Sequence, residues 1–202
     1  MANGKVLTGF SLPYVAKYTC TDGTVTYSDG QPLARGVSAE LKINSSDGSN
    51  FYGDNSLAET SKGKFTSGTV TLIVDGLKAA ARKLIYGLPA DETLTVESKE
   101  VKITPYDDSQ EQPYVGIGFV ARYQEEGVES YTAYILTKSL FSPEPLSAAT
   151  QEQDISFQTT SLEATLTRDG SAKHTWRKMA EDLTTEADAY AVIKAILTPK
   201  VA

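Results

Sequence analysis

Alternation of apolar and polar residues with a period of two runs through much of this chain and restricts its fold class more than any other feature. In Val37–Ile43, apolar residues at every second position alternate with Ser38, Glu40 and a lysine. This period places apolar side chains on one face of a β-strand and polar side chains on the other. A second such segment carries Thr69 and Thr71 on its polar face. The pattern predicts a mainly β fold with a sheet that is wetted on one side.

The longest alternating stretch, Tyr114–Leu140, predicts a β-hairpin. Its arms meet at residues 125–127, a Glu-Glu-Gly sequence that suits a turn. Phe119 of the first arm should share an apolar face with Leu136 and Leu140 of the second. The opposite face is also partly apolar, so one face should cover the core and the other should meet something else. Further strands are expected at residues 13–19, 24–28, 64–74, 93–103, 155–160 and 162–167.

Two segments have the spacing of helices. The first, Asp75–Ile85, has Asp75 as its expected N-cap and a glycine after its end. The second, residues 184–198, begins after Thr185, where Asp188 completes a capping-box-like pair. Both helices have an apolar stripe that can dock on a sheet.

A polar stretch of unusual length, residues 44–63, separates two of the predicted strands. Connections this long are uncommon in compact domains unless they bind something or are disordered. The stretch carries an aromatic pair, a turn motif and a leucine: Phe51, Tyr52, Gly53, Asp54, Asn55 and Leu57. Because aromatic and aliphatic side chains gain free energy when they are covered, we expect an extended arm that is ordered by contact with another protein.

Charge and composition exclude several function classes. With 26 acidic and 19 basic residues the net charge is −7, and no basic block resembles a phosphate-binding stripe, so tight nucleic-acid binding is not expected. A single cysteine, Cys20, allows no internal disulfide and no cysteine zinc cluster, which indicates a reducing compartment. No export signal and no membrane-spanning stretch are evident, and we expect the protein to stay where it is made.

Catalytic residues are scarce. His174 is the only histidine, and it is more simply a loop residue near Trp176, itself a packing or interface anchor. Cys20 would need this same histidine as its base and is expected to be a small buried hydrophobe. The acid pairs Asp107-Asp108 and Glu125-Glu126 are neighbours in turns, whereas glycosidases place two carboxylates across a cleft. We therefore expect no enzyme.

Ligand motifs are equally weak. The oxygen-rich string at residues 44–50 lacks the spaced acids and closing glutamate of a calcium loop. Gly116 and Gly118 lie inside a predicted strand and open no helix, so they indicate close backbone approach rather than phosphate binding. The basic residues within 173–178 are expected to be a solvated face or a salt-bridge partner for a neighbouring subunit. No metal and no cofactor are predicted.

Several motifs occur in a consistent order along the chain: Leu12–Ala16, Phe51–Asn55, Gly68–Leu77, Pro113–Val120, Tyr131–Tyr134, Phe141–Pro143 and Ile155–Thr159. In their order and spacing, from about Leu12 to Trp176, they resemble the major tail proteins of long-tailed phages with non-contractile tails. One position departs from the pattern, since Gly53 stands where a small side chain such as alanine is expected.

The resemblance implies a tail-tube subunit with one domain over residues 1–202. The implied fold is a β-sandwich or partial barrel with a flanking α-helix, a C-terminal helix and a long assembly loop. Copies of such a subunit close into hexameric rings that stack into the tube of the virion, which is assembled in the host cytoplasm. Double-stranded DNA passes through the lumen without specific binding, and tape-measure and tail-terminator proteins are the expected partners. The arm around residues 51–57 would contact the next ring, and the candidates for lining the lumen are Ser38, Glu40, Thr69 and Thr71.

Two other functions fit the same pattern. An inner-tube protein of a contractile tail or a related injection system would share the sandwich and differ in having a sheath partner. A non-catalytic carbohydrate-binding β-sandwich would also tolerate tyrosine-rich strands, and binding to immobilised glycans as a monomer would distinguish it.

Overall fold

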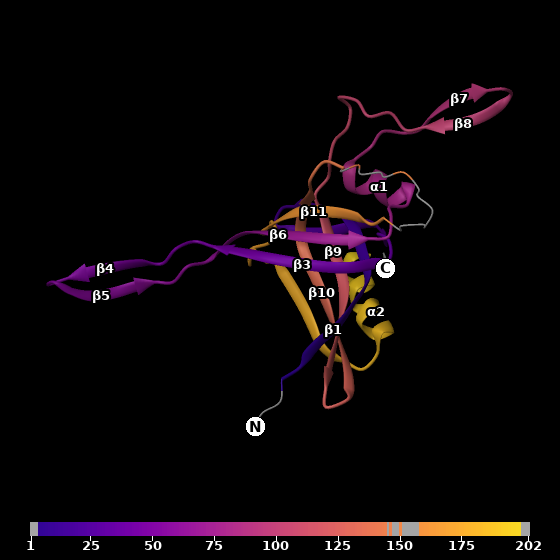
Figure 1. Cartoon of the computed structure of the whole chain (residues 1–202). Helices are drawn as coiled ribbons and strands as arrows, with labels where there is room; N and C mark the ends of the chain where they lie inside the picture. Colours follow the sequence, from indigo (N-terminus) through magenta and orange to yellow (C-terminus); the bar gives the residue numbers. More distant parts are fainter. Residues whose placement is uncertain (1–3, 145, 147–149, 151–157, 199–202) are drawn as a thin grey trace.

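The computed structural model describes residues 4–144, 146, 150 and 158–198 (Figure 1). These residues form a mainly β protein with a large antiparallel sheet, two separate hairpins and two helices. The elements in chain order are β1 Val6–Thr21, β2 Thr24–Pro32, β3 Gly36–Ser45, β4 Ser49–Gly53, β5 Ser56–Ser61, β6 Phe65–Val74, α1 Ala79–Tyr86, β7 Glu92–Val96, β8 Lys99–Ile103, β9 Val115–Glu125, β10 Val128–Phe141, β11 Thr160–Thr167, β12 Arg177–Leu183 and α2 Glu186–Leu197.

The large sheet has the strand order β2-β1-β9-β10-β11-β6-β3, and β12 also pairs with β10. Residues 131–136 of β10 pair with β12, while residues 138–141 of the same strand pair with β11. The sheet therefore divides along β10, and β11-β6-β3 form a second layer. The layers meet again where the ring of Phe10 in β1 lies directly on Gly36 in β3. The result is the predicted sandwich or partial barrel.

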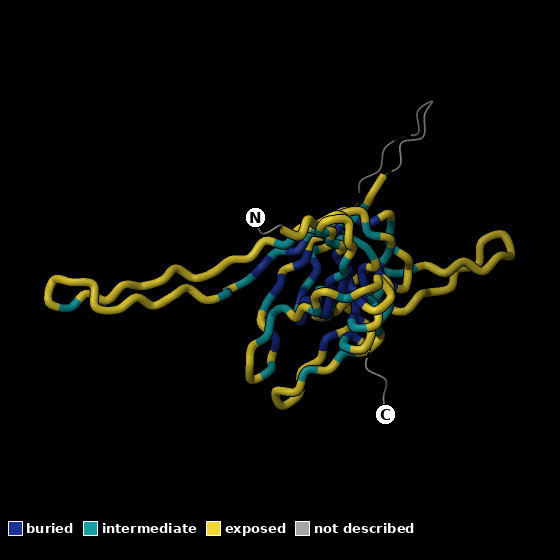
Figure 2. The backbone as a smooth tube through the Cα atoms, turned by 90° about the horizontal axis from the view of Figure 1, so that it is seen from below, coloured by how far each residue is buried: buried dark blue, intermediate teal, exposed yellow. Residues whose placement is uncertain are grey.

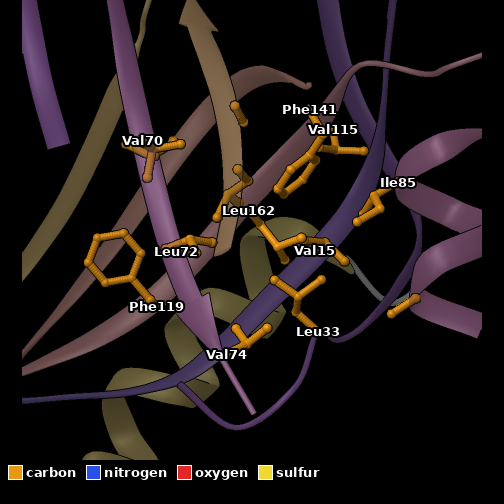
Figure 3. Packing of buried hydrophobic residues seen from close by; sticks show 14 of the residues in the cluster. Val15, Leu33, Val70, Leu72, Val74, Ile85, Val115, Phe119, Phe141 and Leu162 are labelled. Carbon is orange, nitrogen blue, oxygen red and sulfur yellow. The ribbon is translucent and has the colours of Figure 1, made fainter. Parts of the chain in front are cut away.

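The main core lies between the two layers (Figure 3). Val70, Leu72 and Val74 point inward from β6, as the period of two predicts, because alternate residues of a strand share one face. Helix α1 closes one end of this core with Ile85 and Tyr86.

A second core lies on the outer face of β1, β9 and β10, where α2 packs. Ile193 and Leu197 of α2 are fully buried there. A Cβ atom on Gly116 would lie only 2.6 Å from Leu197 Cδ2, so the close approach expected at this glycine is confirmed. The second apolar face of the predicted hairpin is thus covered by a helix of the same chain.

Of the two predicted helix N-termini, one is confirmed and the other is wrong. Helix α2 begins as predicted: the Asp188 N–H donates to Thr185 Oγ1 at 3.1 Å, and Thr185 Oγ1 donates to the Asp188 carboxylate at 2.7 Å. The N-cap predicted at Asp75 is wrong, because α1 begins after Lys78, which makes no side-chain cap. Asp75 instead accepts a hydrogen bond from the backbone N–H of Arg35 at 3.0 Å. A tertiary partner has replaced the local one.

Three strand expectations need correction. The single strand predicted at 93–103 is a hairpin, because Glu97 and Ser98 adopt positive φ values of 48° and 65° and reverse the chain. The prediction that Leu140 shares the core face with Leu136 is wrong, and Phe141 takes that place in the core. The cause is a register shift between Leu136 and Ser139 in the ladder with β9. Strand β12 was not expected. Residues 155–157 of the strand predicted at 155–160 lie outside the described residues.

Cys20 was expected to be buried, and this is wrong: the thiol is free and its residue exposed. Cys20 pairs with Val25 close to the turn that joins β1 and β2, where the sandwich no longer covers the strands. Gly170 lies against its sulfur.

Candidate self-association surfaces

The arm at residues 44–63 is a two-stranded hairpin rather than an irregular loop. Strands β4 and β5 are joined through Asp54 and Asn55, which have positive φ values of 49° and 61°, the geometry of a tight hairpin turn. The hairpin extends away from the body as a continuation of β3 and β6 (Figure 1). Figure 2 shows that it is exposed along nearly its whole length.

The end of this arm presents apolar side chains to solvent. Phe51, Tyr52 and Leu57 are 66%, 64% and 54% exposed. Tyr52 lies opposite Leu57 in the ladder, so these two side chains share one face, and Phe51 points to the other face. An isolated two-stranded hairpin is marginally stable in water, so apolar groups placed on both of its faces indicate a contact surface.

The space around Gly53 would accommodate the small side chain expected at this position. A Cβ atom at this position would lie 3.6 Å from the Ala58 Cβ atom, which is an ordinary contact distance. Position 53 therefore accepts a small side chain, and glycine is not required by the space around it.

A second hairpin, β7–β8, projects from the opposite side of the body (Figures 1 and 2). Register places Leu94 opposite Val101, so one face carries an apolar stripe in which every side chain is exposed. The members of the stripe are Leu94, Val96, Val101 and Ile103. Sequence reasoning missed this surface, although the pair Glu97-Ser98 between two alternating runs was a possible turn signal.

The base of the second hairpin is fixed to α1. Lys83 Nζ lies 2.6 Å from the Asp91 carboxylate, and Thr104 Oγ1 donates to the same group at 2.6 Å. The hydrogen bond from Lys83, followed by that from Thr104, lowers the pKa of Asp91 below its ordinary value. These contacts orient the hairpin relative to the core.

The four polar residues predicted to line a lumen lie together on the outer face of the β11-β6-β3 layer. Glu40 of β3 pairs with Thr71 of β6, and Thr71 pairs on its other side with Glu163 of β11. Ser38 and Thr69 lie in neighbouring rows of the same face. The structure adds Glu163 and Lys42 to the set.

This polar face is weakly acidic. Lys42 Nζ lies 3.3 Å from the Glu40 carboxylate, and both side chains are well exposed. Two carboxylates, Glu40 and Glu163, against one ammonium group leave a net charge of −1 on these three residues. Hydroxyl groups form most of the remaining surface.

Two of the candidate catalytic residues, His174 and Asp107, are exposed and lie outside the strands and helices. His174 is exposed, and its N–H donates to the Ser171 carbonyl in a turn at 2.9 Å. Asp107 accepts from the Ser109 N–H at 2.8 Å, and its hydrogen bonds from Ser109 lower its pKa. Within the described ranges, no group of three histidine, cysteine or acidic residues is suited to hold a metal ion. Among the helices described, none has the length and apolar character needed to cross a membrane.

Trp176 is a packing anchor. Its ring stacks on Phe65 with 4.5 Å between centroids and 5° between planes, and the Arg177 guanidinium lies 4.7 Å from its centroid. Part of the predicted basic cluster therefore covers an aromatic pair.

Comparison with protein-family models gives no match, and comparison with curated proteins gives none. What the chain does must be inferred from its surfaces.

Proposed function

We propose that this chain is the repeating subunit of a phage tail tube, in which hexameric rings of identical copies stack into a hollow conduit for DNA. The observation that carries the proposal is the β4–β5 arm. It extends far from the body and ends in exposed Phe51, Tyr52 and Leu57. A neighbouring copy of the chain would cover this surface and remove its apolar side chains from water.

The sheet supplies edges that neighbouring copies can use. Within the described chain, β2 and β3 end the strand order of the large sheet, so one edge of each forms no ladder. Unpaired edges invite pairing with other chains, and a closed ring satisfies them without runaway aggregation. Lateral pairing between copies would join the β11-β6-β3 layers around a common axis.

The polar outer face of that layer suits the wall of a DNA conduit. A cationic wall would bind phosphates by releasing counterions and would hold the duplex. Ser38, Glu40, Thr69 and Thr71 form a hydroxyl-rich surface with a slight negative charge, which would let DNA slide. Tape-measure and tail-terminator proteins would then set the length of the tube, and no catalytic group is needed.

Electron microscopy of the purified protein at increasing concentration tests the proposal. Hollow tubes with six-fold rings are expected, and sedimentation should show assembly above a threshold concentration. A protein that stays monomeric at every concentration, and also after addition of preformed phage tails as seeds, would contradict it.

A further inference from the structure

An apolar cavity of about 240 Å³ opens at the side of the sandwich, next to the base of the arm. Leu41 and Ile43 of β3 line one wall, and Phe119 and Tyr134 of the other layer line the opposite wall. Leu7 and Arg177 complete its rim.

One wall of this cavity is held by aromatic contacts, and its rim is partly exposed. Phe119 stacks on Tyr134 with centroids 5.2 Å apart, and the Tyr134 hydroxyl is hydrogen-bonded to Tyr123 at 2.8 Å. On the rim, Leu7 is 60% exposed and Ile43 is 41% exposed. Covering this apolar surface would be favourable by roughly 25 cal/mol per Å².

We propose that the cavity receives the arm tip of a second copy, with Tyr52 entering and Leu57 covering the rim. The inference rests on the proposed function and names the surface to which the arm binds. An aromatic ring fits, since a protein cavity of about 150 Å³ accepts benzene. Tyr52 and Leu57 share one face of the hairpin, so both can meet the cavity together.

Charge favours the same occupant. The hairpin at residues 49–61 carries Asp54 and Glu59 and has no lysine or arginine. Arg177 is the charged residue among those that line the cavity. An acidic tip therefore meets a basic rim, which orients the arm and selects against a basic partner.

The dimensions of the chain also agree. Strands β3 and β6 have 10 residues each, which at ~3.3 Å per residue corresponds to a body of about 33 Å along this direction. From Ile43 to Asp54 the arm advances over a similar number of residues, a reach of about 36 Å at the same rise. If copies stack end to end, an arm spans the next body and its tip arrives at the base of the next arm. Such head-to-tail contacts repeat without closing, as a tube requires.

Disulfide trapping tests this contact. In a Cys20→Ser background, a chain with Ile43→Cys and Leu57→Cys, which keeps the Tyr52 ring, should form a ladder of covalent multimers when oxidised by air with a copper catalyst. The matched control pairs Leu57→Cys with Val37→Cys, because Val37 is 55% exposed on the same strand as Ile43 but does not line the cavity. The control should give few cross-linked products.

The outcomes separate the two proposals. Tubes that form without the ladder would overturn the proposed docking site but not the proposed tube function. A ladder that is equally strong in the control would have the same meaning. A cross-link within one monomer would also overturn it, since the arm would then fold back on its own cavity. If the Cys20→Ser parent forms neither tubes nor smaller assemblies, the proposed function fails as well. An axial repeat well above about 36 Å would exceed the reach of the arm and would exclude the contact independently.

Discussion

Ile193 of α2 lies directly on the backbone of Gly118 in β9, so close that a methyl group at position 118 would overlap the Ile193 Cγ2 atom. Ile193 is fully buried, and its β-branched side chain has little rotational freedom in a helix. The glycine therefore sets the distance between α2 and the sheet. This contact closes the outer face of the layer that carries one wall of the cavity.

Replacement of Gly118 by alanine should destabilise the folded protein by about 1–3 kcal/mol, the usual cost of overpacking a filled core. Urea unfolding followed by circular dichroism measures the change. Gly9→Ala is the matched control, because Gly9 also lies in a strand and its added Cβ would meet Arg122 at an ordinary 3.4 Å. Equal stability of the two variants would mean that α2 does not pack on β9 as described.

The ion pair between Asp75 and Arg35 should make stability depend on pH in the acid range. Arg35 Nε lies 2.5 Å from the Asp75 carboxylate, and the hydrogen bonds from its side chain and backbone lower the pKa of Asp75. A carboxylate with a depressed folded-state pKa stabilises the fold above its unfolded pKa of about 3.9 and loses that effect as pH falls through the folded value. The contribution is small because Arg35 is largely exposed.

Asp75→Asn should therefore be less stable than the parent near pH 6, and this difference should shrink towards about pH 3. Thermal unfolding midpoints across this range measure it. Asp108→Asn removes the same charge from another exposed turn and serves as the control. A difference between Asp75→Asn and the parent that stays constant with pH would contradict the assigned ion pair.

Local patterns were sufficient for much of the fold. Alternation located β3 and β6 because each buries one face only, and Thr185 marked the start of α2 because its partner Asp188 is three residues away. Where a distant residue competes, the same reasoning fails. Asp75 binds Arg35 across the chain and does not cap α1, and the register shift after Leu136 depends on how β10 meets β9.

Of the two proposed contact surfaces, the sequence identifies the arm end but not the cavity. Phe51, Tyr52 and Leu57 could be identified from the sequence, since exposed apolar residues in a long polar stretch are a local signal. The cavity could not be identified from the sequence, because its lining residues come from segments as distant as Leu7 and Arg177, which only the folded sheet brings together.

Two aspartates on the stripe of the second hairpin should impair assembly without unfolding the subunit. Leu94 and Val101 lie opposite each other and are 50% and 44% exposed, so Leu94→Asp with Val101→Asp leaves the core untouched. If another copy covers the stripe, the threshold concentration for assembly should rise at least about tenfold, equivalent to about 1.4 kcal/mol. Sedimentation of the assembled fraction measures this threshold.

The control for that variant places the same charge on the opposite face of the hairpin, by Thr93→Asp with Thr95→Asp. Its threshold should stay close to that of the parent. If both double variants assemble like the parent, the β7–β8 hairpin makes no contact between copies.

Removal of residues 51–55 should yield a folded subunit that does not stack. The arm end is exposed and lies outside both core clusters, so the thermal midpoint should remain within a degree or two of the parent value. Electron microscopy should show isolated rings or monomers. Tubes of normal length from this variant would refute a stacking role for the arm.

Reversal of charge on the polar face tests whether it lines the lumen. Glu40 and Glu163 flank Thr71 in one row across β3, β6 and β11, so Glu40→Lys with Glu163→Lys converts a weakly acidic row into a basic one. Tubes assembled from this variant should retain short duplex DNA at low salt and release it as salt increases, because phosphate binding is driven by counterion release. Particles that carry the variant should also eject DNA more slowly.

Glu111→Lys adds a positive charge at an exposed position outside the sheet and should change neither result. Unchanged DNA retention and ejection in the double variant would exclude this face as the wall of the conduit, because a basic wall around a duplex cannot remain electrostatically neutral towards phosphates.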